Sequence, residues 1–183
     1  AAERLDIRFR EADAEALPVP DGAFDAVVST FGVMFTPDQE RAAAEMARVC
    51  RADGRIGLAN WTPEGFIGQL FKTIGKYVPP PAGLRSPALW GTRERIAELF
   101  EKDAALIASE KRHFVFRYRS PEHWLAVFRG FYGPVLKAFE ATDAERRIEL
   151  QQEMLALGDR FNRADDGTMV VPGEYLQVVI TRQ

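Results

Sequence analysis

Two short segments of this sequence place polar groups at the ends of apolar runs, where a ligand can bind. Asp13 and Ala14 follow a short apolar alternation at 7–9, and Ser29-Thr30-Phe31 ends the apolar run 24–30. In open parallel sheets, ligands bind at the carboxyl ends of the strands, where the strand order reverses. We therefore expect a cofactor site where the two segments meet. The alternative is that both polar side chains only cap loops.

The elements that position these segments can be predicted from the same stretch. The segment 18–22 contains two prolines, an aspartate and a glycine, which predict a loop. The run 24–30 is apolar and β-branched with almost no polar alternation, which is typical of a central strand covered on both faces. The prediction is a strand at 7–9, a loop, and a buried strand at 24–30.

The next stretch predicts a helix and a further parallel strand. Thr36-Pro-Asp-Gln39 combines an N-cap, a proline at the first helical position and a capping-box glutamine, which predicts a helix to about Cys50. The segment 51–54 predicts a turn, and 55–61 predicts a strand. The order strand, helix, strand favours a parallel crossover, so both strands end at the same edge of the sheet.

The segment Leu17-Pro-Val-Pro-Asp-Gly-Ala-Phe-Asp25 resembles the turn between the third and fourth strands of class I S-adenosylmethionine-dependent methyltransferases. It is similar to the branch with quinone-biosynthesis and other small-molecule methyltransferases, and Val19 and Ala23 are mild departures. The segment 48–54 also resembles a turn of that family, with Ala52-Asp53 where Pro-Gly is usual. The resemblance is firm over residues 13–61 and weaker afterwards.

This resemblance implies S-adenosylmethionine as the cofactor and gives each segment a role. Asp13 is expected to accept a hydrogen bond from the adenine amino group, and the Ala14 backbone N–H to reach a ring nitrogen. Ser29, Thr30 and Phe31 are expected to line the methionine side of the cofactor.

The family also has a glycine-rich turn after its first strand and an acidic residue after its second, both of which bind the cofactor. This chain has no Gly-x-Gly pair, and residues 1–6 correspond to the run into the third strand. We therefore expect two strands and their helices to precede residue 1, over roughly 60–90 residues. Without them, the chain as given is expected to be inactive.

The rest of the chain predicts helices and two strands that complete the sheet. Helix caps are expected at Thr92, Ser120 and Thr142, and the strands 107–118 and 175–181 are expected to pair antiparallel. The fold class is thus α/β, a Rossmann-like methyltransferase sheet without its N-terminal strands, with a C-terminal antiparallel hairpin and an inserted helical lid. The expected regions are a cofactor-binding core at 1–62, a helical connection and lid at 63–106, terminal strands at 107–119 and 168–183, and a helical insertion over the substrate site at 120–167.

Aromatic residues near the strand ends or in the helical regions are the candidates for contact with the methyl acceptor. They are Phe35, Trp61, Phe66, Trp90, Phe128 and Tyr132. Core packing is the alternative for each of them. In the helix expected after Ser120, Trp124, Phe128 and Phe131 follow helical spacing, so this helix is expected to close part of the pocket.

The catalytic residues are unassigned, and His123 and Tyr132 are the two candidates for a general base. Alignment of the acceptor with the S–CH₃ bond supplies much of the rate, so a base is needed only where the acceptor holds its proton. His113 and His123 lack the spacing of a zinc site, and no metal is expected.

The composition bounds the function further. The 183 residues are 46% hydrophobic with a net charge of −3, which fits one domain and gives no electrostatic footprint for nucleic acid. Basic and aromatic residues mix at 111–119, which indicates a nucleic-acid surface or a solvated sheet edge, and we favour the edge. No apolar run approaches the ~18 residues of a membrane span. Cys50 is the single cysteine and is interpreted as a core thiol in a cytoplasmic protein.

The sequence thus predicts a methyltransferase for a small, fairly apolar acceptor. It leaves the oligomeric state open, with a homodimer as one possibility. One alternative is a non-catalytic ligand-binding or oligomerisation module with the same fold. Another is a nicotinamide-dependent oxidoreductase, which is disfavoured because the turn at 17–25 is not its signature. The identity of the methylated atom stays open.

Overall fold

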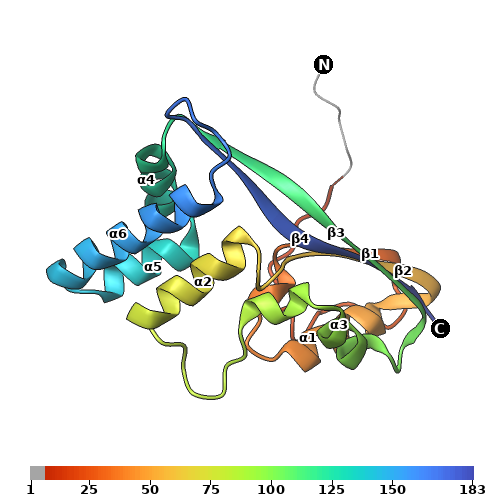
Figure 1. Ribbon diagram of the computed structural model, residues 1–183. Helices are drawn as coiled ribbons and strands as arrows, with labels where there is room; N and C mark the ends of the chain where they lie inside the picture. Colours follow the sequence, from red (N-terminus) through yellow and green to blue (C-terminus); the bar gives the residue numbers. More distant parts are fainter. Residues whose placement is uncertain (1–6) are drawn as a thin grey trace.

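The computed structural model describes residues 7–183, so the expectation for residues 1–6 lies outside the described residues. This part contains a four-stranded mixed sheet and six α-helices (Figure 1). In chain order the elements are β1 (Phe24–Thr30), the 3₁₀ helix η1 (Val33–Phe35), α1 (Gln39–Val49), β2 (Cys50–Trp61), α2 (Phe66–Tyr77), the 3₁₀ helix η2 (Pro87–Gly91), α3 (Arg93–Phe100), β3 (Ala104–Tyr118), α4 (Pro121–Phe131), α5 (Gly133–Ala141), α6 (Ala144–Phe161) and β4 (Met169–Arg182).

The sheet joins a parallel pair of strands to an antiparallel hairpin, in the order β1-β2-β4-β3. β1 runs parallel to β2, with Ser29 opposite Leu58, and α1 connects the two strands. β4 pairs antiparallel with both β2 and β3. The predicted α/β class, the parallel crossover and the terminal hairpin are therefore confirmed.

The β3–β4 hairpin is longer than its neighbours and carries the sheet into the helical part of the molecule. β2 ends at Trp61, opposite Tyr175, whereas β3 and β4 continue to the pair Tyr118–Met169. Figure 1 shows this extension leading to the group of α2, α4, α5 and α6, while α1 and α3 lie together beside the other end of the sheet. The edge that holds the ends of β1 and β2 therefore lies between two groups of helices.

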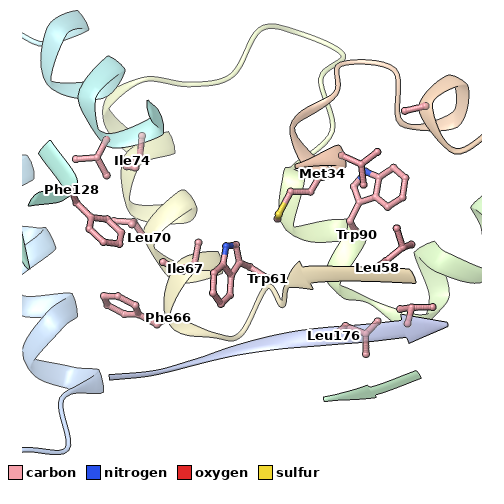
Figure 2. Packing of buried hydrophobic residues seen from close by; sticks show 14 of the residues in the cluster. Met34, Leu58, Trp61, Phe66, Ile67, Leu70, Ile74, Trp90, Phe128 and Leu176 are labelled. Atoms are coloured by element: carbon pink, nitrogen blue, oxygen red, sulfur yellow. The ribbon is translucent and has the colours of Figure 1, made fainter. Parts of the chain in front are cut away.

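One continuous hydrophobic core joins the sheet to both groups of helices. Figure 2 shows Trp61 between Met34 and Trp90 on one side and Phe66 and Leu70 on the other. Each of these side chains is at most 7% exposed. Because burial of a large apolar side chain contributes about 1.5–3 kcal/mol, this core fixes the end of β2 firmly.

One prediction for the N-terminal strands was wrong, and a second is not met within residues 7–183. Residues 7–12 form no strand, and Ile7 and Phe9 are 57% and 91% exposed. β1 forms as expected, but it is not covered on both faces, since Val28 is 70% exposed. Within residues 7–183, β1 is an edge strand that pairs only with β2. Burial is set by tertiary neighbours, so an apolar strand stays exposed where no layer covers it.

The turn predicted at 51–54 forms as a bulge at the start of β2. These residues lie opposite the single residue Asp25, and the register shifts there. Asp53 has φ = 58°, in the left-handed region. A Cβ atom at Gly54 would lie only 2.8 Å from the carbonyl oxygen of Arg51, so the tight turn needs glycine at this position.

Two predicted helix caps were displaced by one or two residues. Asp38 caps α1 in place of Thr36, and Asp143 caps α6 in place of Thr142, each through a backbone N–H three residues later. The two threonine hydroxyls instead donate to carbonyl groups of the preceding turn, which occupies them. The other two predicted caps are confirmed, at Thr92 and Ser120.

The apolar face of α4 is shorter than predicted. Trp124 and Phe128 are buried, but Phe131 is 88% exposed. The helix ends at Phe131, and α5 begins at Gly133. The last turn of α4 therefore lies beyond the core that its preceding turns reach.

Candidate functional site

The backbone turns sharply where β1 ends, and this turn stands at the edge predicted for a ligand. Phe31 has φ = 60°, a conformation that large L-residues rarely adopt. Its N–H donates to the carbonyl oxygen of Ala59 at 2.8 Å, and Ser29 Oγ accepts from Val33 N at 3.0 Å. Strained residues of this kind persist where many contacts hold them, and they cluster at ligand sites.

Two aromatic rings from neighbouring strands hold Phe31 in place. Its ring stacks on Trp61 with ring centroids 3.9 Å apart, and Tyr175 meets it edge-on at 5.5 Å. Trp61 and Tyr175 are directly opposite each other on β2 and β4, so both project from the same face of the sheet. The structure thus brings Ser29, Phe31 and Trp61 together and adds Tyr175, which the sequence did not single out.

Asp13 and Ala14 form a turn in the loop before β1, in which Asp13 is exposed and Ala14 is half-buried. Asp13 Oδ1 accepts from Glu15 N at 2.9 Å, and the Asp13 carbonyl accepts from Ala16 N at 3.1 Å. Among the described residues, the second carboxylate oxygen of Asp13 and the Ala14 N–H make no hydrogen bond. The turn therefore presents the carboxylate of Asp13 as an acceptor and the N–H of Ala14 as a donor, side by side. The bond from Glu15 N to Asp13 also fits the alternative in which Asp13 only caps the loop.

Three charged side chains of α1 attach this loop to the rest of the fold. Arg41 Nε donates to the carbonyl oxygen of Glu15 at 2.8 Å, and Glu45 Oε2 accepts from Leu17 N at 2.7 Å. Arg48 donates to the carbonyl oxygen of Leu17 at 3.0 Å and forms an ion pair with Glu45 at 2.7 Å. The Arg48 guanidinium lowers the pKa of Glu45 to about 2, so this carboxylate is charged at neutral pH.

The predicted acceptor contacts divide into one exposed ring and a buried set. Phe35 ends η1, is 42% exposed, and lies with its ring centroid 5.7 Å from that of Phe71 on α2. Both rings line an apolar cavity of about 250 Å³. By contrast, Phe66, Trp90 and Phe128 are at most 6% exposed and pack in the core.

Of the two candidates for a general base, His123 lies away from the ligand edge, and Tyr132 packs on Phe128 with ring centroids 4.8 Å apart. His123 packs on Tyr118 at 5.7 Å between ring centroids. Tyr118 is six residues along β3 from the position opposite Tyr175, or about 20 Å at the rise of a strand. Burial raises the pKa of Tyr132, so its phenol stays protonated at neutral pH.

The described part of the chain was also searched for a metal site, a reactive thiol and a membrane-spanning helix. Residues 7–183 contain no group of three or more His, Cys, Asp or Glu arranged to hold a metal ion. Cys50 is buried, and burial raises the pKa of its thiol. Among the helices of residues 7–183, none combines the length and the apolar character that a membrane-spanning helix needs.

Two further residues near the strand ends were missed from the sequence. The amide of Asn60 is fully buried on β2, and neither of its polar atoms has a partner among the described residues. A buried group without a partner costs about 1–3 kcal/mol, so such residues are seldom kept for packing alone. Asn60 was detectable in the sequence, because it is a polar residue inside the apolar run 55–61. Phe71 is the second missed residue, and no signal in the sequence marked it because its contact Phe35 is distant in sequence.

Comparisons with known proteins agree with this geometry. Residues 1–58 match the family described as Methyltransferase domain. Over 84 residues, the chain is 42% identical to the demethylmenaquinone methyltransferase of Thermus thermophilus. The matched segment covers 45% of this chain and 38% of that relative. Over residues 1–58 the chain is therefore similar to the methyltransferase domain, which agrees with its resemblance to class I S-adenosylmethionine-dependent methyltransferases.

Longer matches lead to proteins without a named activity. The uncharacterized protein Rv1403c of Mycobacterium tuberculosis is 44% identical over 143 residues, 77% of this chain and 52% of the relative. The chain spans about half the length of the curated relatives it matches. The crystal structure of the YcgJ protein from Bacillus subtilis has a TM-score of 0.56 at 18% identity, covering 96% of this chain and 71% of that chain, and shows a shared fold.

Proposed function

We propose that the protein transfers a methyl group from S-adenosylmethionine to a small, fairly apolar acceptor. The observation that carries the proposal is the strained Phe31, stacked on Trp61 at the carboxyl edge of two parallel strands in a methyltransferase domain. That edge is where sheets of this kind bind ligands. The relative named demethylmenaquinone methyltransferase supports an apolar acceptor.

The turn at Asp13 fits the adenine of this cofactor. Adenine offers an exocyclic amino group and an adjacent ring nitrogen, which need one acceptor and one donor. The second carboxylate oxygen of Asp13 and the Ala14 N–H supply this pair. In the proposal, Arg41 and Glu45 keep the turn in place from α1.

The turn at Phe31 fits the methionine end. Ser29 Oγ accepts from Val33 N and retains its own hydrogen to donate, and Thr30 is exposed at the strand end. The face of the half-buried Phe31 ring that is turned away from Trp61 can attract a cationic group, and the sulfonium is such a group. These residues would therefore hold the polar and the charged parts of the methionine side.

The chemistry asks mainly for alignment. Bound S-adenosylmethionine supplies a methyl group that the sulfonium already activates. The contribution of this chain is to orient the acceptor and exclude water, and a well-oriented pair can gain about 7–11 kcal/mol of the barrier. The rigid stack of Phe31, Trp61 and Tyr175 is suited to that task. We assign no general base, because His123 lies far from this edge and the buried phenol of Tyr132 stays protonated at neutral pH.

Binding of S-adenosylmethionine to the protein as encoded in its genome tests the proposal at Asp13. Asp13→Ala should weaken binding about 2- to 160-fold, since loss of one hydrogen bond costs on the order of 0.5–3 kcal/mol, depending on desolvation. Asp165→Ala is the matched control, because Asp165 is exposed and makes no hydrogen bond within the described part. Isothermal titration calorimetry gives the affinity, and thermal unfolding reports stability.

Two outcomes would contradict the proposal in different ways. Unchanged affinity and unchanged stability in Asp13→Ala would leave this residue as a loop acid. Firm cofactor binding with no transfer of a labelled methyl group to any of a broad set of apolar acceptors would favour the non-catalytic module.

A further inference from the structure

The apolar cavity next to Phe35 has the size and walls of a small ligand site. Its volume is about 250 Å³, and its walls come from η1, from α2, from the segment 78–87 and from the start of α5. The side chains that matter most are Phe35, Phe71, Ile74, Val78 and Pro87. Sites for drug-sized ligands are about 300–1,000 Å³, so this cavity suits a single ring or a short branched chain.

The cavity is tied to the edge of the sheet where the cofactor is proposed to bind. Ser29 Oγ accepts from Val33 N and so fixes the first residue of η1 to the end of β1. Two residues later, Phe35 forms a wall of the cavity and packs edge-on against Phe71. A ligand group in the cavity would therefore lie one short helical turn from the strand end.

One charged residue lines this apolar space. Arg85 is half exposed, and its Nη1 lies 2.7 Å from Glu40 Oε1. The same Glu40 oxygen also accepts from Arg95 Nη2 at 2.7 Å, and the Arg95 side chain is only 6% exposed. Glu40 therefore keeps a buried, charged partner when Arg85 leaves it.

This arrangement makes Arg85 free to change its partner. An arginine binds a carboxylate through two parallel N–H···O bonds, a geometry that favours carboxylates over neutral groups. The single contact to Glu40 uses one Nη atom of Arg85. A ligand carboxylate can take this guanidinium without leaving Glu40 unpaired.

We propose that this cavity binds the apolar part of the methyl acceptor, and that the acceptor is a small aromatic or branched aliphatic carboxylate whose charge pairs with Arg85. The inference rests on the proposed methyl transfer only where it identifies the bound ligand as the methyl acceptor. The cavity and the arginine define a binding site on their own, so its ligand can be measured without the cofactor.

Binding of trans-cinnamate and of its neutral analogue cinnamamide to the protein as encoded tests this site. We expect cinnamate to bind at least fivefold more tightly than cinnamamide. Arg85→Gln should remove that preference and leave the affinity for cinnamamide unchanged. Phe71→Ala should weaken both probes by at least fivefold, because it removes an apolar wall. Arg55→Gln, an exposed arginine on β2, is the control and should keep the preference.

Each contrary result overturns a stated part. Equal affinity for the two probes in the unmodified protein, or a preference that survives in Arg85→Gln, would remove Arg85 as the anion partner. No binding of either probe, or binding unaffected by Phe71→Ala, would remove the cavity as a site. Methyl transfer to other acceptors in such a protein would leave the proposed function standing, because these measurements contain no cofactor.

Discussion

At the scale of single residues, the ion pair of Glu45 and Arg48 predicts how the protein responds to acid. Arg48 lowers the pKa of Glu45 from 4.5 to about 2 in the folded state. A carboxyl group with a lowered folded pKa adds stability above its unfolded pKa, and this stability is lost as the pH falls through the folded pKa. The contribution is therefore complete above pH 4.5 and disappears toward pH 2.

The comparison of the protein with Glu45→Gln measures this effect. At pH 6 the variant should be less stable by about 1.5–3 kcal/mol, the range for a hydrogen bond to a charged group. The difference should shrink as the pH falls from 5 to 2, as urea unfolding at each pH will show. A difference that stays constant over this window would mean that Glu45 stabilises the loop without its charge.

The sequence located one strand end of the candidate site and missed the residues that depend on contact. Ser29 could be placed at the end of β1 because turn-forming residues mark the loop before this strand, whereas Asp13 was placed after a strand that does not form. Phe71 and Tyr175 could not be placed there, since their contacts with Phe35 and Phe31 join distant parts of the chain. The strain at Phe31 was also beyond prediction, because nothing in a phenylalanine favours a positive φ.

At the scale of elements, local sequence signals predicted the positions of helices and strands more accurately than they predicted the burial of side chains. The crossover, the hairpin and two caps follow from patterns of a few residues, and the displaced caps moved only to a neighbouring aspartate. Burial failed at β1 and at the end of α4, where Val28 and Phe131 are exposed. Exposure depends on which layer covers an element, and a periodic pattern does not identify that layer.

Helix α4 offers a test that separates packing from ligand binding. Phe128 is 6% exposed and packs between Trp124 and Tyr132, with ring centroids 5.2 and 4.8 Å away. Phe128→Ala should lower the free energy of unfolding by about 3–5 kcal/mol, because it leaves a cavity. Its affinity for S-adenosylmethionine should be unchanged in the folded protein.

The same helix supplies the control for this test. Phe131 is 88% exposed, so Phe131→Ala should change the free energy of unfolding by no more than about 0.5 kcal/mol. Chemical denaturation of both variants measures the effect. A stable Phe128→Ala protein with altered acceptor turnover would instead return α4 to the role of a lid over the substrate.

At the scale of the whole molecule, the sheet of residues 7–183 has an apolar edge strand, β1. Val28 is 70% and Phe24 is 45% exposed, and within the described residues β1 pairs only with β2. The opposite edge, β3, carries Lys111, Arg112 and Arg117, and charges of this kind discourage edge pairing. The two edges therefore differ sharply in their tendency to associate.

A polypeptide of residues 1–183 alone should self-associate through β1, because an exposed apolar edge strand pairs readily with another chain. Val28→Lys places a charge on that strand and should lower the associated fraction, whereas Val115→Lys, on the charged edge strand β3, should have little effect. Analytical ultracentrifugation of the three proteins measures the associated fraction over a range of concentrations. The protein as encoded in its genome serves as the reference in the same experiment. If residues 1–183 are monomeric and unfold in one sharp transition, β1 is not an associating edge; if Val115→Lys lowers association as much as Val28→Lys, the contact lies elsewhere.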